Sequence, residues 1–475
     1  MKTSLCFALL LLWSAAAFGQ PAFLVKDLGL TPSNGSSQPT TGVEIAGVLY
    51  FAAEDDAHGR ELWRTDGTTE GTRRVSDICP GPCNGVTTTS LSEDTAVLSE
   101  VLFFVASDGV SGKELWRSDG TSRGTFRVRD LCPGRCSVGI RDLAAYDGLL
   151  YFAGEDPFTG GRTLWSTDGT RAATRPFPLA DCGGSENPAQ LRVGGGLLYF
   201  VASHPESGRE LWRTNGTCQG TMLVKDICLD CPIAPRSLTA FEDRLLFWAF
   251  DVTHGYELWS TLGTPETTHL VVDLIPGPEG STTDLITPFG GKLYYRLSFC
   301  PTDLCVYKTD GTAAGTEAAV ELDTPGERPV QLLPVGNQLY FETSGISIGF
   351  RSLWVTDGEP ATTRRVAEDF YPPMNLLADQ AGWLLFGAQT EPGEAELWRS
   401  DGSAVGTAMV LDINPREGSA PRRGSTLGRQ TLFVANDGVH GRELWRSDGS
   451  AAGTELVADL HPSASSAKPA DLVAF

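Results

Sequence analysis

Short apolar and polar blocks alternate along this chain, and the same blocks return many times. They are most easily aligned on an aromatic residue that usually follows a leucine. This position recurs nine times, on average every 48 residues or so, at Trp63, Trp116, Trp165, Trp212, Trp259, Tyr307, Trp354, Trp398 and Trp445. A repeat of this length predicts one supersecondary unit that is stacked many times.

Each copy holds four short segments, each about as long as a typical strand. The first ends in a leucine after a proline, as in PAQL at 188–191, and the second is an aromatic run such as VLYFAA from Val48. The third carries the tryptophan, as in ELWRTDG from Glu61, and the fourth is a group such as VSDI at 75–78. The near-continuous apolar runs of the second segment predict strands that are buried on both faces.

Turn residues separate the third segment from the fourth. An Asp-Gly pair follows the aromatic segment in seven copies, at Asp66, Asp119, Asp168, Asp310, Asp357, Asp401 and Asp448 with the glycine after each. Such pairs mark tight reversals between strands. Four antiparallel strands in each unit of 40 to 50 residues are typical of a β-propeller blade. We therefore predict an all-β fold, a β-propeller of about nine four-stranded antiparallel blades.

The two ends of the chain carry extra segments. A further copy of the fourth segment stands at 25–28, and a further copy of the first stands at 469–475. Rings of this kind are usually closed by a strand from the opposite terminus, so we expect these pieces to close the ring. Propellers typically have 4 to 8 blades, so an open or differently closed array is the alternative. No linker divides the repeats, which predicts a single domain over 20–475.

The first nineteen residues predict a secretory signal peptide. They combine a basic start at Lys2, an apolar run and small residues before a cleavage point near Gly19. The apolar run is shorter than the roughly 20 residues that a membrane-spanning helix needs, and no later segment is long and apolar enough to span one. We expect a protein that is secreted or held outside the cell envelope.

The charge balance is strongly acidic. The chain has 59 Asp and Glu against 37 Lys and Arg, a net charge of −22, and loss of Lys2 with the signal peptide brings it to −23. Nucleic acid is therefore excluded as a partner, because phosphate binding needs a basic surface. Solubility of an exported protein explains the acidic charge.

Ten cysteines remain after Cys6 leaves with the signal peptide, and eight of them form four local pairs. In an oxidising compartment such pairs predict disulfides that shape loops: Cys79 with Cys83, Cys132 with Cys136, Cys228 with Cys231, and Cys300 with Cys305. A zinc site is disfavoured, because the pairs lie far apart and no histidine accompanies them. A redox CxxC would begin a helix, whereas the pair Cys228 and Cys231 follows a predicted strand. The pairing of Cys182 and Cys218 stays open.

The recurrent string ELWxxDGTxxGTxxVxDI stands in full at 61–78 and 114–131. It resembles the repeat of the ELWxxDGT repeat proteins, secreted bacterial proteins whose role is largely undefined, and the match covers essentially the whole chain after the signal peptide. The resemblance implies a secreted β-propeller and supplies no catalytic residues. The Asp-Gly turn beside an aromatic strand also resembles, more weakly, the Asp-box of sialidases and related propellers, where the box is mainly structural.

Two sets of repeated acidic residues need a role. A glutamate two residues before the tryptophan could bond a neighbouring blade, or pair with the adjacent Arg60, Arg209 or Arg442; it stands at Glu61, Glu114, Glu210, Glu257, Glu396 and Glu443. Loop carboxylates could bind calcium, and the candidates are Asp55, Asp108 and Asp437. Because Asp commonly bonds its own turn and no DxDxDG loop is present, we favour the turn role and predict no metal or cofactor.

No catalytic residues stand out. The motifs GxSxG, HExxH, GxGxxG and the P-loop are absent, and a repeat offers no distinct carboxylate pair for glycoside hydrolysis. We therefore predict a non-catalytic binding or scaffold module with a protein or glycan ligand. The alternatives are a carbohydrate-active enzyme of the sialidase or lyase kind, and a calcium-stabilised structural protein. An enzyme requires non-repeating acids, arginines and tyrosines at the central channel, and a channel lined only by repeated apolar or small residues would exclude it.

Overall fold

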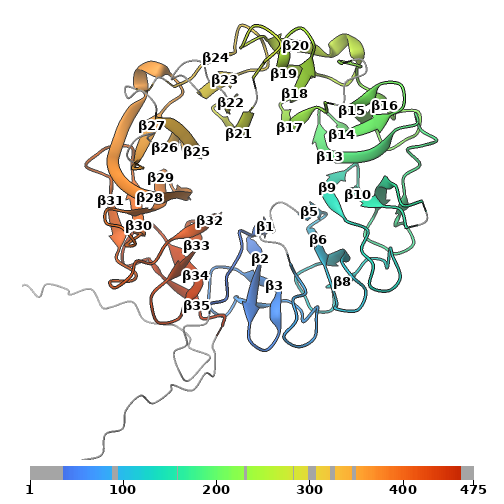
Figure 1. Ribbon diagram of the computed structural model, residues 1–475. Coiled ribbons are helices and arrows are strands. Elements are labelled where there is room, and N and C mark those ends of the chain that lie inside the picture. The colour runs from blue at the N-terminus through green and yellow to red at the C-terminus, as the bar shows by residue number, and fades with distance from the viewer. Residues whose placement is uncertain are drawn as a thin grey trace, which may run out of the picture.

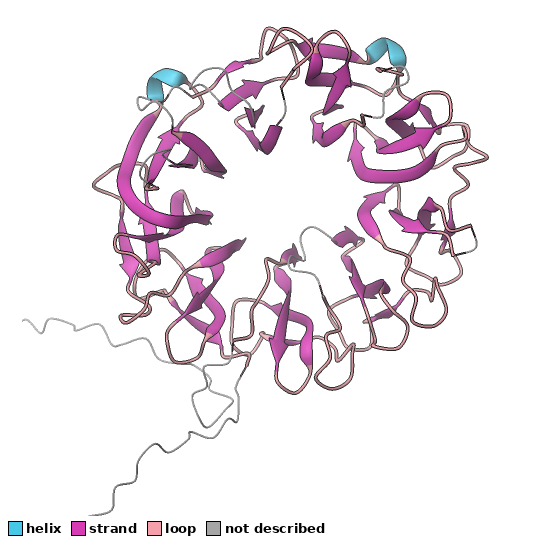
Figure 2. Ribbon diagram, viewed as in Figure 1, coloured by secondary structure: helices cyan, strands magenta, loops and turns pink. Residues whose placement is uncertain are grey.

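The computed structural model describes residues 36–87, 95–157, 159–228, 233–281, 283–297, 306–320, 322, 327–344 and 349–461. Strands follow one another around a ring (Figures 1 and 2). Two short 3-10 helices, η1 (Pro265–Thr267) and η2 (Pro360–Thr362), complete the regular structure of the described residues. None of their helices has the length and apolar character to cross a membrane.

Nine consecutive groups of four antiparallel strands form the blades of a β-propeller. The first three blades are β1 (Val43–Ile45), β2 (Val48–Asp55), β3 (Gly59–Thr65), β4 (Arg73–Arg74); β5 (Thr95–Leu98), β6 (Val101–Ala106), β7 (Glu114–Ser118), β8 (Phe126–Arg127); and β9 (Arg141–Tyr146), β10 (Leu149–Glu155), β11 (Arg162–Thr167), β12 (Arg175–Pro176). The next three are β13 (Glu186–Gly194), β14 (Leu197–His204), β15 (Gly208–Thr214), β16 (Met222–Leu223); β17 (Arg236–Phe241), β18 (Arg244–Asp251), β19 (Gly255–Thr261), β20 (His269–Val272); and β21 (Thr283–Phe289), β22 (Lys292–Leu297), β23 (Val306–Thr309), β24 (Glu317–Ala318). The last three are β25 (Arg328–Val335), β26 (Gln338–Ser344), β27 (Arg351–Thr356), β28 (Arg364–Gln380), which continues into β29 (Trp383–Gln389), β30 (Glu396–Ser400), β31 (Ala408–Leu411); and β32 (Arg422–Leu427), β33 (Gln430–Asn436), β34 (Arg442–Ser447), β35 (Glu455–Ala458).

One strand serves two blades. The early part of β28 pairs with β27, and its later part pairs with β29, so the two blades form one seven-stranded sheet. No loop separates the fourth strand of the seventh blade from the first strand of the eighth. This continuity accounts for the shortest spacing between tryptophans, from Trp354 to Trp398.

The core lies between neighbouring blades. The second strands are buried on both faces, as predicted: in β2, Phe51 and the alanines that follow it are fully buried. The repeat tryptophans lie in the third strands, where Trp63 donates from its indole nitrogen to the Ala53 carbonyl at 3.0 Å. One apolar cluster joins Tyr151 of the third blade to Phe200 and Trp212 of the fourth. Burial of each aromatic side chain stabilises the fold by roughly 1.5–3 kcal/mol. Each blade is therefore stabilised mainly by its apolar contacts with the neighbouring blades.

The fourth strand differs from the prediction. We placed it on the Val-x-Asp-Ile group, but in the first blade the strand is β4, just before Val75. The Val75 amide still bonds the Leu62 carbonyl at 2.8 Å. After Val75, the amides of Ile78 and Cys79 donate hydrogen bonds to the Glu61 carboxylate, so they cannot extend the backbone hydrogen bonds of the sheet. Among the described strands, β20, β28, β31 and β35 do reach into this group or its equivalent.

The described residues do not test the predicted ring closure by the terminal segments. The segments 25–28 and 469–475 lie outside the described residues, and among the described strands each blade is built from consecutive strands. The last blade packs against the first through an apolar cluster that includes Phe51, Leu432 and Val457. Face-to-face packing, as between all other blades, therefore brings the ends of the ring together (Figure 1).

Candidate functional site

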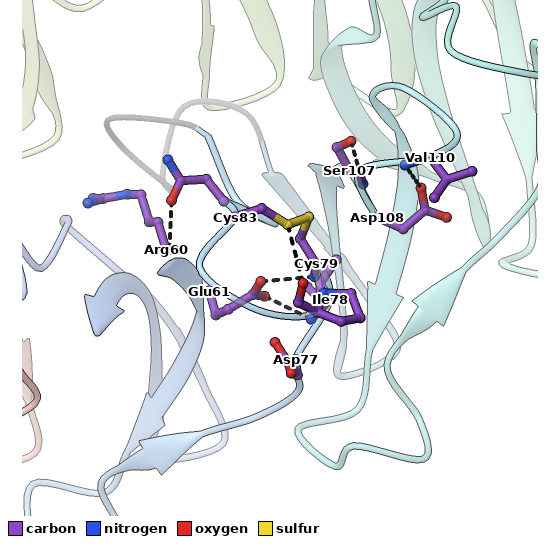
Figure 3. Close-up of a disulfide and its surroundings, with 12 residues drawn as sticks. Arg60, Glu61, Asp77, Ile78, Cys79, Cys83, Ser107, Asp108 and Val110 are labelled. Carbon is purple, nitrogen blue, oxygen red and sulfur yellow. Dashed lines mark hydrogen bonds between the residues drawn. A yellow bond between two sulfur atoms is a disulfide. The ribbon is translucent and has the colours of Figure 1, made fainter. Parts of the chain in front are cut away.

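The glutamate that precedes six of the Leu-Trp pairs is buried and links neighbouring blades by hydrogen bonds. Glu61 is fully buried, and its carboxylate accepts hydrogen bonds from the amides of Ile78 and Cys79, both at 3.0 Å (Figure 3). Glu257 similarly accepts from Leu274 and from Ser281, which leads into the next blade. The expected bond to a neighbouring blade is therefore present. The alternative pairing with arginine is wrong for Glu61, because Arg60 pairs with Glu54 at 3.6 Å.

Burial changes the proton affinity of these glutamates. Removal from water raises the pKa of Glu61, Glu114, Glu210 and Glu257 to about 7, and that of Glu443 to about 8. The hydrogen bonds from backbone amides favour the ionised form but do not outweigh burial. Perturbed carboxyl groups can mark active sites. Here they recur in blade after blade and hold backbone, so we assign them a structural role.

The three calcium candidates each serve their own turn. Asp55, in the loop between β2 and β3, accepts from the amides of Ala57 and His58, and its carboxylate lies 2.8 Å from the His58 ring nitrogen. Asp108 and Asp437 make the same kind of turn in other blades. Within the part of the chain that is described, no three metal-ligating side chains converge. The turn role therefore accounts for the contacts of these aspartates.

Three disulfides lie wholly within the described residues. Cys79 bonds Cys83 and Cys132 bonds Cys136, as the spacing predicted, with Cα atoms 5.6 and 5.7 Å apart. Cys182 bonds Cys218, which the sequence left open, and this bridge links the entrance of the fourth blade to its β15–β16 turn. Cys228 is also disulfide-bonded, while Cys231, Cys300 and Cys305 lie outside the described residues.

The first strand of each blade faces the centre of the ring (Figure 1). Several of these inner strands contain a bulge, where the pairing register with the second strand shifts. At this bulge Asp142, Gln190, Ser237 and Arg423 adopt positive φ angles of 56°, 55°, 55° and 60°. Non-glycine residues rarely hold this conformation, and bulges redirect side chains and are common near active sites. The backbone conformation at this position therefore recurs in these blades, while the side chain differs from blade to blade.

A cavity of about 550 Å³ lies on the inner wall between β9, β13, β17 and β21. Three of the bulge residues line it, namely Asp142, Gln190 and Ser237, together with Arg192 and Thr239. Asp142 is the one carboxylate, and Arg192 the one cation, among the described residues that line it. Charged and polar residues that differ between blades line this wall. A channel lined only by repeated apolar or small residues, which would exclude an enzyme, is therefore not found here.

Neighbouring strands hold the polar side chains of the cavity in place. Arg192 donates from Nε to the Leu238 carbonyl at 3.1 Å, which fixes its guanidinium against the next blade. Gln190 donates to the Pro235 carbonyl at 3.2 Å, also across the blade boundary. A guanidinium anchored through Nε keeps its two terminal nitrogens for a ligand, and this fork matches a carboxylate. The cavity thus combines an acid or base with an anion-binding group.

Sequence reasoning missed these residues, because no motif surrounds them. A usable signal was present: each bulge residue lies nine positions before the third residue of the second strand, as Asp142 does before Tyr151. Aligning the copies on that residue shows Asp, Gln, Ser and Arg at one position. This position varies inside an otherwise regular repeat, and known sequence motifs do not reveal such variation.

A second cavity, of about 530 Å³, lies beside the Cys182–Cys218 bridge and is lined by His204, Glu206, Trp212 and Asp226. Trp212 and Asp226 belong to segments that recur in most blades. This cavity is therefore a blade groove of the repeat, and the inner-wall cavity is the stronger candidate site.

Comparison with known proteins finds similar folds only. No protein-family model and no curated protein matches the chain. Among solved structures it resembles a puromycin hydrolase, at 14% identity and a TM-score of 0.41 over 85% of this chain and 58% of that one. It also resembles the GH74 xyloglucanase of Xanthomonas campestris, at 15% identity and a TM-score of 0.37 over 89% and 75%. A third is the β-propeller domain of the Trilobed protease from Pyrococcus furiosus, described as having an open velcro topology, at 14% identity and a TM-score of 0.33 over 69% and 97%.

These comparisons correct one prediction. The similar structures include peptidases, a glycoside hydrolase and a dehydrogenase. These contradict our prediction of a non-catalytic binding or scaffold module and agree better with the enzyme that we kept as an alternative. The chain spans only 58% of the puromycin hydrolase. At these identities and TM-scores the likeness concerns the fold alone, so no residue role is carried over from these proteins.

Proposed function

We propose that this protein is a secreted carbohydrate-active enzyme of the lyase kind, which cleaves an acidic polysaccharide at the inner wall of the propeller. One observation carries the proposal: Asp142 and Arg192 line the same cavity, which thus holds one carboxylate and one guanidinium. The three disulfides support the exported location, because such bonds persist in oxidising compartments.

The chemistry needs one base and one cation. The guanidinium of Arg192 binds the carboxylate of a uronate ring and offsets its charge, which makes the adjacent C–H bond more acidic. Asp142 removes that proton, a carbon–carbon double bond forms, and the bond to the glycosidic oxygen breaks. The departing oxygen takes a proton from water. Atoms and charges balance without an oxidant or cofactor.

Hydrolysis fits the same cavity less well. Glycosidases use two carboxyl groups that flank the bond to be broken. Asp142 is the single carboxylate among the described residues that line the cavity. Elimination uses the arginine that hydrolysis does not require, so we propose elimination.

The test is digestion of several uronate polymers with the full-length mature protein. We expect products whose new double bond absorbs ultraviolet light. Asp142→Asn should lower kcat by about a hundredfold or more, because it removes the base. Arg192→Gln should raise KM and also lower kcat, because the carboxylate is held before and during proton removal. Asp147→Asn, at an exposed turn after the same strand, is the matched control and should retain full activity.

Two results would contradict the proposal. New reducing ends without ultraviolet absorbance would show hydrolysis in place of elimination. Equal activity of Asp142→Asn and Asp147→Asn would remove the cavity from the reaction.

We also propose membership of the ELWxxDGT repeat family. The proposal is supported by the full strings at 61–78 and 114–131 and by the shared role of their residues, from the buried glutamate to the Asp-Gly turn. An alignment of further family members, in which the bulge position varies while the buried glutamates and the turn residues persist, is the expected result.

A further inference from the structure

Four arginines gather where the last blade meets the first. Arg422 and Arg423 begin β32, Arg442 begins β34, and Arg60 lies in β3. We call this group the seam arginines. All four are partly buried. Arg423 is the bulge residue of its blade, so the arginine stands where other blades place Asp, Gln or Ser.

Three of the seam arginines converge on one short segment of the chain. Arg60 donates from Nη2 to the Gln38 carbonyl at 3.0 Å, and Arg422 donates from Nη2 to Gln38 Oε1 at 3.4 Å. Arg423 donates from Nη1 to the Pro39 carbonyl at 2.6 Å. These bonds bring three guanidinium groups to two consecutive residues.

The positive charge at the seam is poorly balanced. Within the described residues, Arg60 alone among the seam arginines has a carboxylate partner, Glu54 at 3.6 Å. Arg422 Nε is buried and has no hydrogen-bond partner there. Burial, together with the charges of Arg442 and Arg423, lowers the pKa of Arg422 to about 10. Such crowding is unexpected in a protein whose net charge is −22.

We propose that the seam arginines form a binding site for an oxyanion. A phosphate, sulfate or carboxylate group would take hydrogen bonds from several guanidinium groups and relieve their mutual repulsion. The bound anion would also cross-link the first and last blades, which no described peptide segment joins. The group could come from a free inorganic anion or from a charged unit of an acidic glycan. This site is separate from the cavity at Asp142, so the two proposals fail independently.

Isothermal titration with inorganic phosphate, and separately with an oligouronide, tests the proposal at fixed ionic strength set with chloride. We expect one site per chain for at least one probe. Arg442→Gln should weaken binding about tenfold or more, because it removes one charged donor. No hydrogen bond of the Arg442 side chain occurs among the described residues, so its loss should leave the fold intact. Arg209→Gln, which changes the equivalent residue of β15, is the matched control and should bind as the wild type does.

The two probes identify the source of the anion. Binding of phosphate alone indicates a free inorganic anion, and tighter binding of the oligouronide indicates a glycan; either supports the site if Arg442→Gln weakens it. No binding of either probe would overturn the proposal. So would equal weakening by Arg209→Gln, or undiminished binding by Arg442→Gln. Should Arg442→Gln fail to fold, Arg422→Gln provides the same comparison.

Discussion

At the scale of single residues, the buried glutamates couple the stability of the ring to pH. Glu443 is fully buried, yet it accepts from the Leu460 amide and from both the amide and the hydroxyl of Ser37. Its pKa of about 8 lies above the ordinary 4.5. A carboxyl group whose pKa is raised on folding binds more protons in the folded state at intermediate pH. Its stabilising contribution is therefore complete below about pH 4.5 and is lost as pH rises through 8.

We predict that the free energy of unfolding falls between pH 5 and pH 8. A shift of this size corresponds to roughly 2–5 kcal/mol at most for one group. Glu443→Gln should reduce this dependence, because the amide oxygen still accepts hydrogen bonds but cannot ionise. Denaturant unfolding at both pH values, followed by tryptophan fluorescence, measures the effect. Glu70→Gln, at an exposed turn, is the control and should keep the wild-type slope; an unchanged slope in Glu443→Gln would refute the coupling.

At the scale of the element, a second glycine packs closely against the Asp-Gly turn of the first blade. Asp66 accepts hydrogen bonds from the amide and hydroxyl of Thr68, at 2.9 and 2.6 Å, and the Gly71 amide then bonds the Thr68 hydroxyl at 3.0 Å. These bonds lower the pKa of Asp66. A Cβ atom at Gly71 would lie 1.9 Å from the Asp66 carboxylate. The second Gly-Thr of the repeat is therefore part of the turn, not a spacer.

Gly71→Ala should therefore destabilise the first blade by about 1–2 kcal/mol, because Asp66 must give up bonds that hold the turn. Thermal unfolding measures the loss. Gly161→Ala is the matched control, since its nearest neighbour to an added Cβ is the Thr159 hydroxyl at 3.8 Å. A similar small effect in both variants would show that the turn does not depend on the glycine.

The same elements show how far sequence alone could predict this protein. The period, the four segments and the Asp-Gly turn are local patterns, and they predicted the propeller and its blade number. The end of β4 was missed because Glu61 captures the amides of Ile78 and Cys79, a contact between distant residues. The candidate site was missed because Asp142 and Arg192 come from different blades and meet only when the ring forms.

At the scale of the whole molecule, closure repeats contacts that are found between several other blades. The outer arginine Arg399 donates to the Gly449 carbonyl of the next blade at 2.9 Å. Arg446 of the last blade makes the same bond to Gly67 of the first, at 2.5 Å. Glu443 likewise bonds Ser37 as Glu257 bonds Ser281. The contact between the last and first blades is thus of the same kind as those between other blades, but no described peptide segment joins these two blades.

That missing connection predicts an asymmetry between two equivalent arginines. Arg446→Ala and Arg399→Ala each remove one hydrogen bond between blades, with a local cost of about 1 kcal/mol. Arg446→Ala also removes the ion pair with Glu455 of its own blade, so exchange in β1–β4 is the decisive readout. At the seam, separation of the blades opens the ring, whereas at Arg399 the chain still tethers them. Amide hydrogen exchange in β1–β4 and β32–β35 should therefore accelerate several-fold in Arg446→Ala. Arg399→Ala should show only local acceleration around the β34–β35 turn. Equal and local effects in both variants would mean that segments beyond the described residues, not the packing of the two blades, hold the ring closed.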